Sequence, residues 1–163
     1  LTISAAGAYL QGEILQNYCS LILPAGTQTT DCPTADSDLL APSGTQLPVT
    51  PDFKGDLTIR QEFEMMHLPS YWQAAVAHQS GATQDLRTFE SAIIGSLPAY
   101  TSFDLSAGFE TEFFNLDFFI RNATDERGEL YRYTECQISV CGAQYYVAPI
   151  QPRTIGVRYS QAF

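Results

Sequence analysis

The chain has 163 residues, the length of one ordinary domain, and 18 acidic residues against 8 basic ones give it a formal charge of −10. This excess of negative charge would repel a phosphate backbone, so nucleic acid is not expected as a partner. The apolar runs are far shorter than the roughly 18 consecutive residues that a membrane helix needs, so any membrane passage would have to use strands.

The N-terminal part predicts one strand followed by a long loop. A strand is expected over Thr2–Leu15, and the connection Cys19–Val49 is rich in Ser, Thr, Pro, Gly and acidic residues. The chain starts at Leu1 without a signal-peptide pattern, which fits a cut from a longer precursor. Calcium binding by three aspartates of the loop is conceivable, but their spacing fits no EF-hand and favours a solvated acidic loop: Asp31, Asp36 and Asp38.

The clearest strand pattern covers Phe53–Met65. Its odd positions are mostly apolar, whereas its even positions are polar and largely charged: Lys54, Asp56, Thr58, Arg60, Glu62 and Glu64. One face is therefore expected to be apolar and the other to resemble the polar lumen wall of a barrel. A soluble sheet with one wet face gives the same alternation, so this strand alone does not decide between them.

The remaining chain alternates short and long connections between predicted strands. Met66–Ser70 is a short link, and Glu110–Asn115 closes a hairpin. Long polar connections cover Ser80–Leu97 and Ala123–Gln151. The remaining predicted strands are Tyr71–Gln79, Tyr100–Phe109, Asn115–Asn122 and Arg153–Phe163. The sequence thus predicts an all-β, antiparallel up-and-down meander of six strands, with the short turns and long loops at opposite ends, as in outer-membrane barrels.

Four cysteines fall into two close pairs, Cys19 with Cys32 and Cys136 with Cys141, each in a predicted loop. Neither pair has the CxxC spacing or the neighbouring histidines of a zinc site. Local disulfides in an oxidising compartment are the favoured interpretation, and free thiols are the alternative.

No enzyme motif is recognisable, and we expect neither catalytic residues nor a cofactor. The chain has no GxSxG elbow, HExxH pair or phosphate-binding loop. Its two histidines, His67 in a short turn and His78 near a strand end, favour solvated or interfacial positions over metal ligation.

The last strand carries a further signal. Ile155, Val157 and Tyr159 alternate with polar or small residues, and the chain ends at the aromatic Phe163. This terminal pattern resembles the signal that the barrel assembly machinery of Gram-negative bacteria recognises.

Four stretches, taken in chain order, are similar to motifs of one protein family. Gly44–Lys54 is similar to that family's loop-to-strand entry, and Leu97–Leu105 is similar to its next descending strand. Phe118–Asp125 resembles an ascending strand end of the form V-x-N-L-x-D, although Ala123 stands where a larger aliphatic residue is usual. Pro152–Arg158 resembles the final strand. Together the four stretches resemble the C-terminal part of TonB-dependent outer-membrane receptors.

The resemblance implies that residues 1–163 are the C-terminal part of a barrel of about 22 strands, since six strands are fewer than the roughly eight of the smallest known barrels. The plug domain and earlier strands would lie upstream. Implied partners are outer-membrane lipid, the assembly machinery through Phe163, the TonB system through the plug, and a small molecule at external loops. These loops are Ser20–Gly44, Gly81–Ser96 and Asp125–Tyr146.

The implied function is import of a scarce nutrient, such as siderophore-bound iron, cobalamin or carbohydrate, across the outer membrane of a Gram-negative bacterium. One alternative is a passive channel or adhesin barrel, which would share the strands but lack a plug. Another is a secreted soluble β-sandwich that binds through its loops. The transported substrate is not readable from the residues.

Overall fold

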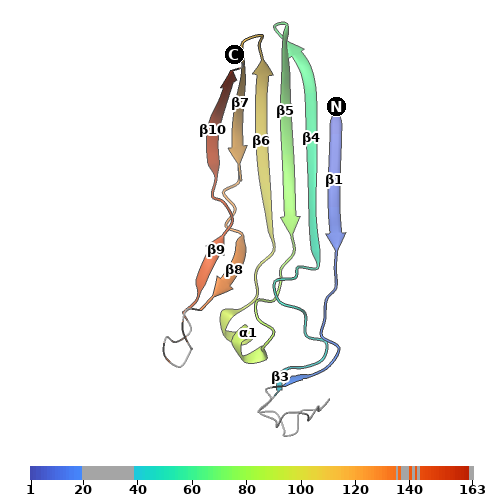
Figure 1. The fold of residues 1–163 in the computed structure, drawn as a ribbon, viewed down its shortest axis with the longest axis vertical. Coiled ribbons are helices and arrows are strands. Elements are labelled where there is room, and N and C mark those ends of the chain that lie inside the picture. Colours follow the sequence, from blue (N-terminus) through green and yellow to red (C-terminus); the bar gives the residue numbers. More distant parts are fainter. Residues whose placement is uncertain (20–38, 135, 137–139, 141, 143, 162–163) are drawn as a thin grey trace.

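The computed structural model describes residues 1–19, 39–134, 136, 140, 142 and 144–161, and its main feature is one long antiparallel sheet (Figure 1). Six strands pair in chain order, which makes the sheet an up-and-down meander. They are β1 (Thr2–Tyr9), β4 (Phe53–Met65), β5 (Leu68–Gln79), β6 (Tyr100–Glu110), β7 (Phe114–Arg121) and β10 (Thr154–Gln161). The predicted all-β antiparallel class and strand order are thereby confirmed.

Two tight turns join strands at one end of the sheet. β4 and β5 are linked by Met66 and His67 alone, with φ of 54° and 64°. Two consecutive left-handed residues give a hairpin the twist that its strands need, which offsets the cost of placing non-glycine side chains there. Between β6 and β7, the Thr111 hydroxyl accepts a hydrogen bond from the Phe114 amide at 2.9 Å. Both termini of the described chain lie at this turn end (Figure 1).

The long connections lie at the opposite end and contain small elements of their own (Figure 1). The short strands β2 (Tyr18–Cys19) and β3 (Leu39–Ala41) pair with each other, as do β8 (Glu129–Tyr133) and β9 (Tyr146–Pro149). The helix α1 (Thr88–Ile94) lies in the connection between β5 and β6. We call this part of the molecule the loop end.

Several predicted boundaries were wrong. The first strand ends at Tyr9 and not at Leu15, because the chain beyond it forms irregular backbone hydrogen bonds, such as Leu10 N to Asp52 O at 2.9 Å, instead of a regular ladder. β5 begins at Leu68, so the preceding turn is shorter than predicted. The predicted end of the last strand at Phe163 stays a prediction, because β10 is described only to Gln161 and Phe163 lies outside the described residues.

The described residues bury few side chains, and the apolar ones among them lie away from the sheet. The buried apolar residues are Ala41, Ala82, Ile94 and Leu97, all at the loop end. Ala82 and Leu97 exchange backbone hydrogen bonds of 3.2 and 2.8 Å, which close the base of the connection that carries α1. The sheet itself is a single layer in the described chain, and neither of its faces has a covering element (Figure 1). Its edges are β1 and β10, which do not pair with each other, so the sheet is open.

Candidate functional site

The register places apolar side chains of all six strands on one face of the sheet. Leu57 of β4 pairs with Val76, and Val76 pairs in turn with Phe103. Leu105 of β6 pairs with Ile120, and paired residues of an antiparallel ladder point to the same side. The apolar face consists of Ile3, Ala5, Tyr9, Phe53, Leu57, Ile59, Phe63, Met65, Leu68, Trp72, Ala74, Val76, Phe103, Leu105, Ala107, Phe109, Phe114, Leu116, Phe118, Ile120, Ile155, Val157 and Tyr159.

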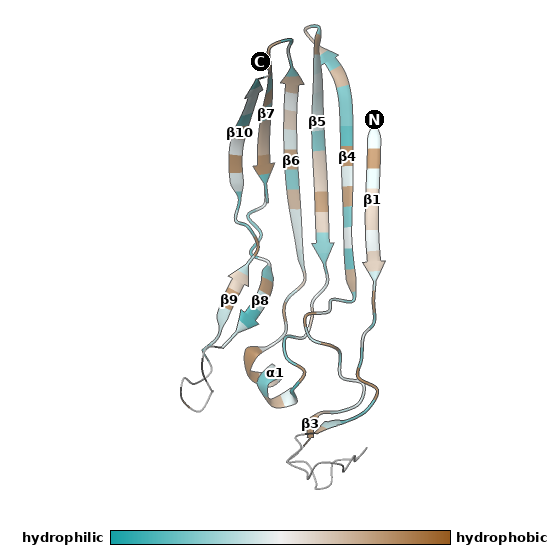
Figure 2. Ribbon diagram, in the orientation of Figure 1, coloured by the Kyte–Doolittle hydropathy of each residue, from teal (hydrophilic) through white to brown (hydrophobic). Residues whose placement is uncertain are grey.

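Most large side chains of the apolar face are open to their surroundings. Their exposed fractions run from 38% for Leu57 to 73% for Tyr9. Monomeric soluble proteins rarely expose a contiguous apolar patch of more than a few hundred Å². In Figure 2, hydrophobic and hydrophilic bands alternate along the strands, as a sheet with two contrasting faces requires. The apolar face is thus a surface that needs an apolar environment.

The opposite face carries a connected set of polar and charged groups. The Tyr71 hydroxyl donates to Asp117 Oδ1 at 2.7 Å, and the Arg60 guanidinium carbon lies 3.8 Å from the centre of the Tyr71 ring. Arg60 also pairs with Glu62 at 3.0 Å. These residues line adjoining hollows of about 320 and 740 Å³ on the polar face. This arrangement agrees with the expectation that Glu62 and Arg60 share one charged face of the sheet.

One aromatic residue breaks the polar pattern for a local reason. Phe119 lies on the polar face opposite Gly156 of β10. A Cβ at Gly156 would come within 2.4 Å of the Phe119 ring, so the ring occupies the space that the glycine leaves. The Arg121 guanidinium carbon lies 5.6 Å from the same ring. The glycine therefore allows one large ring on an otherwise hydrophilic surface.

Two polar anchors organise the loop end. The first is Asn122, which is only 4% exposed and has a φ of 49°. Its side-chain amide donates to the carbonyl oxygens of Glu126 at 2.9 Å and Gln151 at 3.0 Å. Asp125 Oδ1 accepts from the Arg153 amide at 3.2 Å. Asn122 and Asp125 therefore join the outgoing and returning ends of the third long connection.

Arg132 of β8 is the second anchor. Its guanidinium donates to Glu129 and, at 2.8 Å, to the carbonyl oxygen of Ile94 at the end of α1. Its backbone amide donates to Gln84 Oε1 at 3.2 Å. The hydrogen bond that the guanidinium donates to the Glu129 carboxylate is the main cause of the raised pKa of Arg132. The sequence pattern singled out neither this residue nor Gln84, because hydrogen bonds between connections that are distant in sequence leave no periodic signal.

Some predicted site residues lie on the apolar face, two are disulfide-bonded cysteines, and the others lie outside the described residues. Ile155, Val157 and Tyr159 lie on the apolar face, while Phe163 lies outside the described residues. Cys19 and Cys136 are both disulfide-bonded. Their expected partners Cys32 and Cys141, and also Asp31, Asp36 and Asp38, lie outside the described residues, so the pairing stays a prediction.

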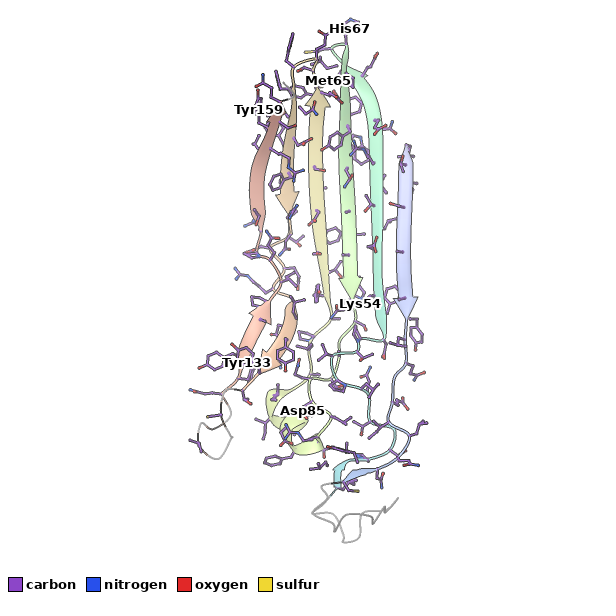
Figure 3. The ribbon with its side chains drawn as sticks, viewed as in Figure 1. Lys54, Met65, His67, Asp85, Tyr133 and Tyr159 are labelled. Carbon is purple, nitrogen blue, oxygen red and sulfur yellow. The ribbon has the colours of Figure 1, made fainter. Side chains whose placement is uncertain are left out.

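The two histidines lie at opposite ends of the sheet. His67 is in the β4–β5 turn (Figure 3), and His78 Nδ1 is 2.8 Å from Thr101 Oγ1 near the loop end. Within the described part of the chain, no group of three or more His, Cys, Asp or Glu side chains is arranged to hold a metal ion. No described helix has the length and apolarity to cross a membrane.

Comparisons with known proteins give no match for this chain among protein-family models, curated proteins or solved structures.

Proposed function

We propose that this chain is part of the wall of a transmembrane β-barrel in the outer membrane of a Gram-negative bacterium. The observation that carries the proposal is the uncovered apolar face opposite a charged and hydrogen-bonded one. Burying a large apolar side chain in hydrocarbon gains about 1.5–3 kcal/mol relative to water, and the face has such residues on every strand. Lipid on one side and an aqueous lumen on the other would satisfy both faces.

The positions of the connections support a definite orientation. The tight turns and the termini of the described chain lie together, and the long connections lie at the other end (Figure 1). Bacterial outer-membrane barrels have short periplasmic turns and longer extracellular loops. In this proposal the loop end is external, and the two disulfide-bonded cysteines lie in the oxidising space outside the cell.

The two open edges require further strands. An unpaired strand edge in hydrocarbon costs several kcal/mol for each unsatisfied backbone group, so β1 and β10 must each pair with a strand outside this chain. The resemblance of the sequence to TonB-dependent receptors supplies the size of the complete barrel, about 22 strands. Phe163 would serve its assembly, and a plug upstream would couple it to the TonB system.

Within this proposal the protein imports a scarce nutrient and has no enzymatic role. The external connections would contribute to capture of a small molecule, and the plug would transmit the energy for its release. A passive channel or adhesin would use the same wall, but its transport would not depend on TonB. A soluble β-sandwich is disfavoured, because no second layer lies on the apolar face in the described residues.

Two neighbouring alanines of β5 test the membrane position. Ala74 lies on the apolar face between Ile59 and Leu105, and Ala75 lies on the polar face between Thr58 and Asp104. We expect Ala74→Arg to destabilise the membrane-inserted protein by about 2–4 kcal/mol, since its charge would point into lipid. Ala75→Arg should be tolerated, because its charge would face water beside Asp104.

The measurement is the amount of folded, outer-membrane-resident protein, followed by its heat-modifiable electrophoretic mobility. Assembly of Ala75→Arg with loss of Ala74→Arg supports the proposal. Equal assembly of both variants, or recovery of the unchanged protein in the soluble fraction, contradicts it. Uptake that continues after deletion of the TonB system would contradict the energy-coupled function. It would not contradict the proposal that the chain is part of a barrel wall.

A further inference from the structure

The smaller hollow of the polar face lies between two pairs of opposite charge. At one end, Arg158 of β10 pairs with Asp117 of β7 in the ladder. At the other end, Arg121 and Asp104 each lie one position beyond the last residue pair of the β6–β7 ladder, so they are neighbours on adjacent strands. All four side chains line the hollow of about 320 Å³, and Phe119 lies between the two pairs. The hollow thus presents one cation and one anion at each end.

The two arginines of these pairs are available to a ligand. Within the described part of the chain, neither the Arg121 nor the Arg158 guanidinium makes an ion pair or a hydrogen bond, although each lies beside a carboxylate. Arginine binds a carboxylate through two parallel hydrogen bonds, so each guanidinium is suited to the carboxylate of a small molecule.

The two carboxylates differ in their access to a ligand. Asp117 Oδ1 accepts from the Tyr71 hydroxyl at 2.7 Å, and Asp104 Oδ1 accepts from the Asn122 backbone amide at 2.8 Å. Asp117 is half-buried, and the Arg60 guanidinium lies over the neighbouring Tyr71 ring. Asp104 is exposed. An ammonium group of a ligand should therefore bind at Asp104, and a carboxylate group should bind at the opposite end, on the arginine of the other pair.

The spacing of the two pairs sets the length of the ligand. Asp117 and Arg121 are four residues apart in β7, a rise of about 13 Å at roughly 3.3 Å per residue. An extended chain covers roughly 3.3–3.6 Å per residue, so a peptide of about three or four residues spans the hollow. The Phe119 ring, which occupies the space left by Gly156, offers an apolar surface to a side chain in the middle of such a peptide.

We propose that this hollow of the polar face binds a short zwitterionic peptide in an extended conformation. The terminal ammonium group of the peptide binds Asp104, its terminal carboxylate binds Arg158, and an apolar side chain packs on Phe119. A ligand with charges of one sign would meet a like charge at each end of the hollow, so the paired charges select against it. This inference rests on the proposed function, since it names a substrate class for the lumen wall of the barrel.

The test measures binding of the tripeptide Ala-Phe-Ala to the full-length protein in detergent micelles by isothermal titration calorimetry. The N-acetylated and C-amidated forms should each bind more weakly than the free tripeptide by about tenfold or more, because each lacks one charged terminal group. In Asp104→Asn, which keeps the oxygen that accepts from the Asn122 amide, the free and N-acetylated peptides should bind equally. In Arg158→Gln, the free and C-amidated peptides should bind equally.

The matched control is Lys54→Gln. Lys54 lies on the same face near the loop end (Figure 3), but it lines a separate hollow. This variant should therefore keep the affinity of the unchanged protein for all three peptides. The inference is overturned if Ala-Phe-Ala does not bind, if the unchanged protein binds the free and blocked peptides equally, or if Lys54→Gln loses as much affinity as Arg158→Gln. Any of these results, together with the expected behaviour of Ala74→Arg and Ala75→Arg, would refute the peptide site and leave the membrane proposal standing.

Discussion

Asn122 marks the point where a strand ends and a loop begins, and its role depends on one buried amide. Its side chain bonds both sides of the connection that follows β7, and its Oδ1 accepts from the Glu126 amide at 2.9 Å. Asn is one of the few residues with a side chain that adopts a positive φ at low cost. The residue type, the backbone angle and the hydrogen bonds therefore agree.

Replacing Asn122 with Ala should lower the free energy of unfolding by about 2–3 kcal/mol, because three buried hydrogen bonds are lost and the positive φ becomes strained. Urea unfolding in detergent micelles measures the effect. Asn115→Ala is the control, since Asn115 is exposed in β7 and its side chain makes no hydrogen bond in the described structure. Equal destabilisation of the two variants would show that the Asn122 hydrogen bonds add nothing to the free energy of unfolding.

Asp85 should make the stability of the loop end depend on pH. Hydrogen bonds from the Arg87 side chain, at 3.1 and 2.9 Å, and from its backbone amide lower the pKa of Asp85 below its ordinary value of 3.8. A lowered pKa in the folded state stabilises the fold above that ordinary value, and the contribution disappears as pH falls through the folded-state pKa. The loop end should thus lose stability in acid.

Asp85→Asn tests this dependence. The variant should be less stable than the unchanged protein at about pH 7, and the difference should shrink below about pH 4, when the carboxylate of the unchanged protein is protonated. Urea unfolding over that range gives both curves. Glu112→Gln removes an exposed carboxylate from the β6–β7 turn and serves as the control. A difference between Asp85→Asn and the unchanged protein that does not vary with pH would count against the ion pair.

At the scale of elements, the β8–β9 ribbon depends on a contact with a distant connection. Arg132 is 14% exposed and joins the ribbon to the end of α1, whereas Arg127 is 78% exposed and pairs with Asp125 at 3.3 Å. Buried ion pairs that lose one partner are strongly destabilising, but exposed pairs contribute little. Replacing Arg132 should therefore destabilise the ribbon far more than replacing Arg127.

Arg132→Ala should speed hydrogen exchange of the β8 and β9 backbone amides by about tenfold or more, because it leaves Glu129 and the Ile94 carbonyl oxygen unpartnered. Arg127→Ala should leave that exchange unchanged. Hydrogen exchange followed by mass spectrometry resolves the ribbon from the sheet. Protection of the ribbon that survives in Arg132→Ala would mean that backbone pairing alone holds it.

The strands of the sheet could be predicted because their side chains alternate with a period of two. β4 was predicted with its bounds correct, since charged and apolar residues alternate from Lys54 to Met65. β8 could not be found in this way, because Leu130 and Tyr131 are adjacent apolar residues and hide the alternation. The seven-residue helix α1 is too short to show a helical period.

The candidate surfaces could be predicted in part. The apolar face follows from alternation within each strand, but its continuity across six strands depends on the register, which one strand does not contain. The anchors at Asn122 and Arg132 join segments 29 and 38 residues apart, and no local pattern predicts such contacts. The pairing of Tyr133 with Tyr146 in the β8–β9 ladder likewise joins two segments that no local pattern connects.

For the whole molecule, the central question is what covers the apolar face, and Trp72 is placed to answer it. It is the only tryptophan of this chain, it is 42% exposed, and it lies on the apolar face of β5 opposite Ala107. Tryptophan fluorescence is quenched by bromine only on near contact, so lipids brominated on their acyl chains report whether this side chain touches hydrocarbon. Trp72→Phe identifies its share of the signal.

The decisive measurement is therefore the fluorescence of the full-length protein, with and without Trp72→Phe, in bilayers of brominated and ordinary lipid. If the apolar face meets lipid, brominated acyl chains will quench the component that Trp72→Phe removes. If that component is equally bright in both lipids, or the protein stays in solution without associating with the bilayer, the apolar face is covered by something other than membrane and the account is wrong.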